Sequence, residues 1–330
     1  MNIIDSAALP LVSIIIPAYN SEKCIDRCLR SLTAQNYNNL EIIVVDDGST
    51  DSTREHIRQA GILDDRIRMV LSENKGPSSA RNKGLDAMHG QYVLFVDSDD
   101  GLEPDAVAEL VTYATSLNVD LVAFDFTICD QNSRTIPRES ILPRPFPEQK
   151  TAPREELLHL LYSGSLSNFM WSYFYKADIF TVDGLRFNTN VVLMEDALLF
   201  FQVLSQTFIA GIYTDKPLYR YSVTEESQSR LLDDRKIRSG LFAAKKIIEL
   251  HGVPKCDGFN RYIDSQLLFL YNSSLESTDT TNGLQATARR ALLKTARAYG
   301  YVGLPTQLFV KLGLIATGVY KQLYCSLHRK

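Results

Sequence analysis

The first 126 residues alternate between short apolar runs rich in β-branched residues and segments with helical spacing, and this alternation limits the fold more than any other feature. Strands and helices that alternate through short connections form a parallel sheet with helices on both faces. The sequence predicts strands over 11–16, 41–45, 67–71, 92–96 and 120–124. It predicts helices over 21–34, 53–60, 78–88 and 106–117.

Three segments that are candidates for ligand binding directly follow predicted strands. Right-handed crossovers bring the carboxyl ends of parallel strands to one edge of the sheet, and open α/β folds bind their ligands at that edge. The segments concerned are Pro17-Ala18-Tyr19-Asn20, Asp46-Asp47 and Asp97-Ser98-Asp99. Their convergence predicts a ligand site built from the ends of three strands.

The third of these segments carries a cluster of carboxylates, Asp97, Asp99 and Asp100. Asp97 and Asp99 flank Ser98, so both side chains are able to turn toward one point. Two carboxylates suit a hard divalent cation that shares oxygen ligands with substrate phosphates. The alternative is structural, with Asp99 or Asp100 capping a helix that begins at Glu103-Pro104.

Asp46 and Asp47 end a strand ahead of a glycine turn, where a carboxylate accepts hydrogen bonds from a base N–H or from ribose hydroxyls. The structural alternative is an Asx turn followed by a helix cap. We expect both, with Thr50 or Asp51 as the cap and Asp46 or Asp47 as the ligand. Tyr19, just past the first strand, is expected to stack on a base.

Arg81 lies among small residues on a predicted helix. Its planar guanidinium suits a phosphate, a nucleobase or the acidic cluster. An ion pair with Asp97 or Asp99 that serves only the fold is the rival interpretation. The residues alone leave these alternatives open.

Glu195-Asp196 opens a predicted helix in the second half of the chain. The helix dipole and nearby N–H groups favour the ionised form of a carboxylate at this position. A general base needs that form. Taken without the upstream motifs, the two residues would be ordinary first-turn partners of the dipole.

Five motifs in a fixed order resemble those of the family-2 glycosyltransferases, a match far more specific than any single motif. The resemblance covers roughly residues 11–230. The motifs are Val12–Asn20, Asp46–Asp51, Gly76–Gly84, Asp97–Asp100, and Trp171–Lys176 followed by Glu195-Asp196.

The resemblance implies an α/β protein with the GT-A fold: a mostly parallel sheet with helices on both faces, followed by a helical C-terminal region. It implies a catalytic domain over 1–230, with a nucleotide-binding half (11–126) and an acceptor half (127–230). The helical region would be 231–330. The implied reaction moves one sugar, with inversion, from a nucleotide-diphosphate sugar such as a UDP-sugar to a hydroxyl of a glycan or polyprenyl-diphosphate-linked acceptor. The implied setting is bacterial surface-polysaccharide synthesis.

The resemblance also implies roles for individual residues. Asp97 and Asp99 would bind Mn²⁺ or Mg²⁺. Asp196 would be the base, and Glu195 would orient the acceptor or the loop. The donor-binding residues would be Pro17, Tyr19, Asp46, Asp47, Arg81, Asp97 and Ser98.

Two other functions compete with transfer. A sugar-phosphate nucleotidyltransferase would need a basic, glycine-rich loop after the first strand, where this chain has Pro17-Ala18-Tyr19-Asn20. A non-catalytic member would bind nucleotide-sugar or scaffold a complex, and the intact Asp97, Asp99 and Asp196 argue against it. A processive synthase is disfavoured because the single tryptophan, Trp171, is not preceded by Gln-x-x-Arg. We expect Trp171 to be a packing anchor or an acceptor-side wall.

The composition describes an ordinary soluble globular protein of 330 residues, 45% hydrophobic and 22% charged, with room for a large core. A formal net charge of −4 gives no basic field for nucleic acid. The five scattered cysteines indicate free thiols in a reducing cytosol. No secretory leader or long apolar span is evident. We therefore expect a cytoplasmic protein.

An amphipathic helix is expected over 305–327, with apolar residues opposite a polar face that includes Lys311 and Lys321. Such a helix could lie in the interface of the cytoplasmic side of the inner membrane. Packing on the catalytic domain is the equal alternative, because amphipathicity alone does not separate the two.

Overall fold

The computed structural model describes residues 9–130, 134–136, 151–207, 209–213, 215–223 and 233–276. The chain divides into two compact units. The first comprises Met1–Thr189 with Leu199–Ser227, and the second comprises Asn190–Leu198 with Gln228–Lys330. The expected division of residues 1–230 into a nucleotide-binding half and an acceptor half stays a prediction.

The main sheet of the first unit has eight strands in the order β3-β2-β1-β4-β10-β6-β11-β9. Strands β1 to β4 run parallel, as do β6 and β11, whereas β10 and β9 are antiparallel to their neighbours. The sheet is therefore mostly parallel, as predicted. The strands are β1 (Val12–Ala18), β2 (Leu40–Asp46), β3 (Ile67–Leu71), β4 (Tyr92–Phe95), β6 (Leu121–Phe124), β9 (Thr151–Pro153), β10 (Tyr173–Lys176) and β11 (Ile209–Tyr213).

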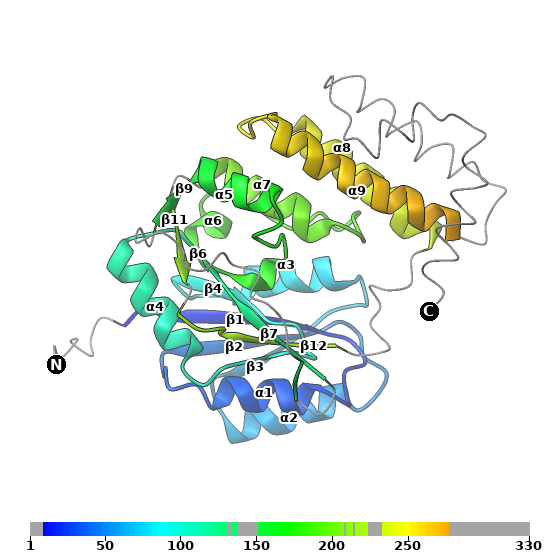
Figure 1. Ribbon diagram of the computed structural model, residues 1–330. Coiled ribbons are helices and arrows are strands. Elements are labelled where there is room, and N and C mark those ends of the chain that lie inside the picture. The colour runs from blue at the N-terminus through cyan, green and yellow to red at the C-terminus, as the bar shows by residue number, and fades with distance from the viewer. Residues whose placement is uncertain are drawn as a thin grey trace. The chain divides into compact units, whose positions relative to one another are not determined.

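Helices cover both faces of this sheet. Helices α1 and α2 lie on one face of the β1–β3 region and α3 lies on the other (Figure 1). Every residue of β2 is buried, as a parallel strand between two helical layers requires. The helical segments of the first unit are α1 (Ile25–Thr33), α2 (Thr53–Leu63), α3 (Pro77–Ala87), α4 (Ala106–Leu117), α5 (Arg154–Tyr162), the 3₁₀ turn η1 (Met170–Ser172) and α6 (Asp178–Thr181).

A second, smaller sheet has the strand order β5-β12-β7-β8. Its strands are β5 (Gly101–Leu102), β7 (Phe126–Cys129), β8 (Thr135–Ile136) and β12 (Tyr219–Ser222). The sequence pattern did not predict this sheet, because two of its strands are only two residues long. β12 pairs with β5, which follows the acidic segment at once, so Tyr219 lies opposite Leu102. Residues more than a hundred positions apart therefore meet beside Asp97–Asp100.

Helix α3 approaches β1 closely at Gly84. A Cβ atom at this position would lie 2.3 Å from Cγ2 of Ile15, so any larger residue would force Ile15 or the helix to move. The same helix begins after Gly76, whose φ of 88° lies in the left-handed region, and Pro77 occupies its first turn. Two glycines of the motif Gly76–Gly84 thus set where α3 begins and how near it packs.

The second unit is helical where the structure describes it. Helix α7 (Glu195–Gln206) begins in this unit and continues into the first, followed by α8 (Asp234–Glu249) and α9 (Asp257–Glu276). Ile237 of α8 and Leu270 of α9 form a buried cluster, against which Leu193, Met194 and Leu241 pack. The expectation of helices after Asp233 is confirmed for 233–276, whereas the helix expected over 305–327 lies outside the described residues.

Within the described residues, Cys24, Cys28, Cys129 and Cys256 are free thiols, as expected. None of the helices described is long and apolar enough to cross a membrane.

Candidate active site

The three predicted site segments that follow β1, β2 and β4 do meet at one edge of the main sheet. In the parallel register, Ala18 pairs with Asp46, and Asp46 pairs with Leu71. The N–H of Val96 donates to the carbonyl of Ile15 at 3.0 Å, which continues the pairing of β4 with β1. The residues that follow β1, β2 and β4 therefore leave the sheet side by side.

Asp97 and Arg81 form an ion pair at this edge. Nη2 of Arg81 lies 2.8 Å from Oδ1 of Asp97, and the arginine side chain is only 7% exposed, against 29% for the aspartate. The guanidinium also lies over the ring of Phe187, 5.4 Å from its centroid. The contact of Arg81 with the acidic cluster is therefore present, while its contact with a phosphate or a nucleobase stays a prediction. The pair holds a positive charge beside the acidic turn.

Asp99 lies in a less favourable setting for a charge. Burial and the neighbouring charge of Asp97 raise the pKa of Asp99 to about 6. A cation next to the carboxylate would favour its ionised form. Among the described residues, no group of three His, Cys, Asp or Glu side chains could hold a metal ion. A cation bound by Asp97 and Asp99 would therefore have to complete its shell with phosphate oxygens and water, and the binding itself stays a prediction.

Ser98 joins the acidic turn to the loop after β1. Its Oγ lies 2.8 Å from Oγ of Ser21, whose N–H donates to Oγ1 of Thr53 at 2.6 Å. Pro17 lies within β1, opposite Val45. The turn and the first two strand ends therefore form one connected edge.

Asp46 and Asp47 each accept hydrogen bonds from the chain itself. Oδ2 of the buried Asp46 accepts from Nε and Nη2 of Arg54 at 2.8 and 2.7 Å, and its Oδ1 accepts from the N–H of Ser49 at 3.1 Å. The carboxylate of Asp47 accepts from the N–H groups of Lys75 and Gly76 at 3.0 and 2.7 Å. Both fix the loops that border the edge, and their expected contact with a nucleotide stays a prediction.

The loop after β2 is tied to the loop after β1. Asp51 accepts from the N–H groups of Thr53 and Glu22, at 3.0 and 3.2 Å, but the residue at the N-cap position of α2 is Ser52, so Asp51 supports the start of the helix without being its cap. The N–H of Thr50 instead donates to the side chain of Asn20 at 2.9 Å, so the expectation that Thr50 caps the helix is wrong. Tyr19 is 37% exposed beside this junction, as a stacking residue needs to be.

The helix-capping alternative for Asp99 and Asp100 is wrong. Helix α4 begins after Asp105, and strand β5 separates it from the acidic turn. Asp100 is instead buried, and it accepts from Oη of Tyr219 at 2.6 Å and from the N–H of Ser222 at 2.7 Å. The sequence pattern missed Tyr219 and Ser222, because no periodic signal links a residue to a partner about 120 positions away.

Trp171 is a packing residue. It is 4% exposed, and its ring stacks on Tyr219 and Tyr221, with centroids at 4.6 and 5.4 Å. Phe169 stacks on it as well, at 5.2 Å. Of the two roles expected for Trp171, the packing anchor is the one present.

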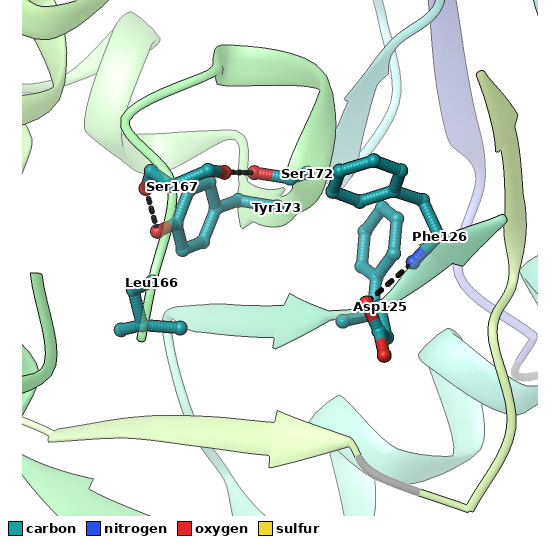
Figure 2. Close-up of a pocket in the computed structure, with 7 residues that line it drawn as sticks. Asp125, Phe126, Leu166, Ser167, Ser172 and Tyr173 are labelled. Carbon is teal, nitrogen blue, oxygen red and sulfur yellow. Dashed lines mark hydrogen bonds between the residues drawn. The ribbon is translucent and has the colours of Figure 1, made fainter. Parts of the chain in front are cut away.

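A small pocket lies at the carboxyl end of β6, beside the amino end of β10 (Figure 2). Its volume of about 10 Å³ has room for one water and none for a sugar ring. Oγ of Ser167 and Oγ of Ser172 lie 2.6 Å apart, and the Tyr173 hydroxyl donates to the Ser167 carbonyl. The pocket is lined by Phe124, Asp125, Phe126, Leu166, Ser167, Ser172 and Tyr173.

Glu195 and Asp196 occupy the first turn of α7, as predicted. The residue before them, Met194, has a φ of 67°. A left-handed backbone is uncommon for a residue other than glycine. Leu193 and Met194 pack against the cluster of Ile237 and Leu270, and the N–H of Val192 donates to Oγ of Ser239 at 2.7 Å. Packing within the second unit thus fixes how α7 starts, while the catalytic roles of Glu195 and Asp196 stay predictions.

Solved structures with a similar fold include a mannosyltransferase and a protein crystallised with a nucleotide sugar. TarS of S. aureus (residues 1–349), crystallised with UDP-GlcNAc, matches with a TM-score of 0.61 and 19% identity over 88% of this chain and 80% of that chain. The mannosyltransferase PcManGT of Pyrobaculum calidifontis, solved with GDP-Man and Mn²⁺, matches with a TM-score of 0.56 and 20% identity over 98% of this chain and 85% of that chain. The protein has the GT-A fold of such enzymes.

Comparison with known sequences identifies the family of this chain. Residues 13–174 match the model of "Glycosyl transferase family 2". EpsH of Bacillus subtilis, named as a glycosyltransferase, is 30% identical over 70% of this chain and 66% of its own length. Glycosyltransferase GlyA of Streptococcus pneumoniae is 34% identical over 72% of this chain and 34% of its own. TuaG of Bacillus subtilis, named for teichuronic acid biosynthesis, is 40% identical over 36% of this chain and 46% of its own.

The chain belongs to glycosyl transferase family 2. Its matched part spans from about a third to two thirds of the length of these three relatives.

Proposed function

We propose that the chain transfers one sugar from a nucleotide-diphosphate sugar, a UDP-sugar in the first instance, to a hydroxyl of a glycan or lipid-linked acceptor. The observation that carries this proposal is the edge at which the ends of β1, β2 and β4 meet around Asp97 and Asp99. UDP-GlcNAc and GDP-Man, the ligands of TarS and PcManGT, support a nucleotide-sugar donor.

The donor would lie along this edge. Tyr19 would stack on the base, and Asp46 or Asp47 would accept from the base or the ribose. Asp97, Ser98 and Arg81 would border the diphosphate, with the guanidinium balancing part of its charge. Pro17 would shape the wall on which the base rests.

Asp97 and Asp99 would hold Mn²⁺ or Mg²⁺, in line with the Mn²⁺ in the structure of PcManGT. When bound, such an ion stabilises negative charge on the departing nucleotide diphosphate. Arg81 would orient the carboxylate of Asp97 through their 2.8 Å contact.

Asp196 would act as the general base. The acceptor oxygen attacks the anomeric carbon as the carboxylate of Asp196 takes the hydroxyl proton. The bond from the anomeric carbon to the phosphate oxygen breaks, and its electron pair leaves with the nucleoside diphosphate. Glu195 would orient the acceptor or the loop. A single displacement of this kind inverts the anomeric configuration.

The acceptor would be a glycan or a polyprenyl-diphosphate-linked saccharide used to build a surface polysaccharide such as O-antigen, capsule or exopolysaccharide. The name of TuaG supports a polysaccharide setting. The chain would act in the cytoplasm, with peripheral contact to the inner membrane. Residues 1–230 would form its catalytic domain and 231–330 its helical region.

The test is a donor panel. Purified protein is incubated with UDP-, GDP- and dTDP-sugars and Mn²⁺, and release of the free nucleotide is measured. We expect release from a UDP-sugar, faster with a saccharide acceptor present, and an inverted product anomer by NMR. A product with retained configuration would contradict the single displacement. Donor binding without any release would favour the non-catalytic alternative, and pyrophosphate release from a nucleoside triphosphate would favour the nucleotidyltransferase.

A further inference from the structure

The third carboxylate of the acidic cluster has a different environment from the two expected to bind the cation. Asp100 is 2% exposed, and both of its oxygens accept hydrogen bonds from β12. Oδ2 accepts from Oη of Tyr219 at 2.6 Å, and Oδ1 accepts from the N–H of Ser222 at 2.7 Å. A carboxylate engaged in this way ties β12 to the turn.

The hydroxyl of Tyr219 contacts the turn at both of its ends. It donates to Asp100 and also accepts from the N–H of Asp97 at 3.2 Å. The turn itself is closed by the N–H of Asp100, which donates to the carbonyl of Asp97 at 3.0 Å. Tyr219 is fully buried, and its ring stacks on Trp171 with planes 16° apart. One locked side chain therefore fixes the first and last residues of the turn.

Helix α1 holds the same turn through its backbone. Nη2 of Arg27 donates to the carbonyl of Asp99 at 2.7 Å and to Oγ of Ser222 at 3.3 Å. Sγ of Cys28 lies 3.6 Å from the carbonyl of Asp97. The backbone of Asp97–Asp100 is thus fixed by α1 as well as by β12.

We propose that Tyr219 and Asp100 are positioning residues, which hold the backbone of Asp97–Asp99 in the conformation that binds the cation and the donor diphosphate. This inference rests on the proposed function. Hydrogen-bond partners that orient metal-binding side chains contribute to metal affinity, and removing one commonly weakens that affinity about 10- to 100-fold. In this proposal Tyr219 and Asp100 act through the turn and do not themselves bind the cation or the sugar.

The test compares two variants that each lose one buried hydroxyl. Tyr219→Phe removes the contact with the turn. Tyr37→Phe is the matched control, because Tyr37 is 6% exposed and its Oη donates to the carbonyl of Pro10 at 2.6 Å, at the opposite ends of the strands. Binding of Mn²⁺ in the presence of UDP is followed by the EPR signal of the free ion, and folding is followed by thermal unfolding.

We expect Tyr219→Phe to raise the Mn²⁺ dissociation constant about 10- to 100-fold. Tyr37→Phe should leave that constant unchanged, although both variants lower Tm. If nucleotide release is measurable, saturating Mn²⁺ should restore kcat of Tyr219→Phe toward the wild-type value. Asp100→Asn, which keeps the shape but loses one acceptor oxygen, is the second variant and should weaken Mn²⁺ binding in the same way.

Failure of this inference differs from failure of the proposed function. If wild type binds Mn²⁺ with UDP and both Tyr219→Phe and Asp100→Asn bind it as Tyr37→Phe does, the positioning role is wrong and the function stands. If wild type shows no binding of Mn²⁺ that depends on UDP, the proposed cofactor is wrong, and the positioning role falls with it.

Discussion

At the scale of residues, the carboxylates at the sheet edge form two groups that differ in the partners they contact within the protein. Asp46, Asp47 and Asp100 accept hydrogen bonds from backbone N–H groups and fix the loops. Asp97 pairs with Arg81, and Asp99 lies where burial and a like charge disfavour its ionised form. This division is the reason we propose a cation at Asp97 and Asp99, where its charge would relieve the repulsion between the two carboxylates.

The base is tested by Asp196→Asn, which keeps the shape of the side chain but removes the proton acceptor. We expect nucleotide binding to survive and kcat to fall by about 10²–10⁴-fold, the usual cost of losing a general base. Measuring kcat and the dissociation constant of the nucleotide separates the two effects. Glu195→Gln is the control and should be milder, because an amide can still orient a ligand. Normal turnover in Asp196→Asn would move the base to another residue.

The hydrogen bonds of Glu41 predict how the free energy of unfolding depends on pH. It accepts from Oγ of Ser13 at 2.6 Å and from the N–H of Gly90 at 3.0 Å, at the edge opposite the site. Burial alone would raise the pKa of Glu41, but these bonds and those from His89 outweigh it and lower the pKa from its ordinary value of 4.5. The carboxylate therefore stabilises the fold above about pH 4.5, and this contribution is lost as the pH falls through the folded-state pKa.

Glu41→Gln should accordingly lower the free energy of unfolding by about 1–3 kcal/mol at pH 7. The difference from wild type should shrink as the pH falls toward 4 and below. Urea unfolding at a series of pH values measures it. Glu55→Gln, on the surface of α2, is the control and should change little. A difference for Glu41→Gln that stays constant with pH would show that the charge of Glu41 does not stabilise the fold.

At the scale of elements, the parallel half of the sheet follows from local patterns. Runs such as 12–18 and 40–46 are apolar on both faces, so they were predictable within a residue or two. β5 and its pairing with β12 were not, because β5 is two residues long and its partner lies about 120 positions later. The candidate site residues divide in the same way, into those that local patterns predict and those that only tertiary packing brings together. Strand ends gave Asp46, Asp97 and Asp99, but the contacts of Tyr219 and Arg27 with the acidic turn depend on tertiary packing.

Packing of α3 on β1 is tested by Gly84→Ala. The new Cβ would lie 2.3 Å from Cγ2 of Ile15, so the helix must move, and we expect a loss of about 1–3 kcal/mol of stability. Gly61→Ala in α2 is the matched control, since its Cβ would lie 3.4 Å from the nearest atom. Alanine's higher helix propensity should then leave stability unchanged or raise it. Equal urea midpoints for the two variants would contradict the close approach.

At the scale of the whole molecule, the amphipathic helix expected over 305–327 is the segment that we propose to contact the membrane, and packing on the protein is its alternative. Deleting the residues after Leu304 should lower sedimentation with anionic liposomes and leave donor hydrolysis intact. If the truncated protein aggregates while lipid binding is unchanged, the helix packs on the protein instead.

The account as a whole depends on the acidic turn at the end of β4, and nucleotide release from a UDP-sugar tests it most directly. Wild type and Asp99→Ala are compared with Mn²⁺ and with EDTA, and Asp97→Ala is included as the variant with the smaller expected loss. We predict release by wild type with Mn²⁺, none with EDTA, and none from Asp99→Ala even when Mn²⁺ is present. Near-wild-type release in EDTA, or by Asp99→Ala, would contradict a cation held by this turn.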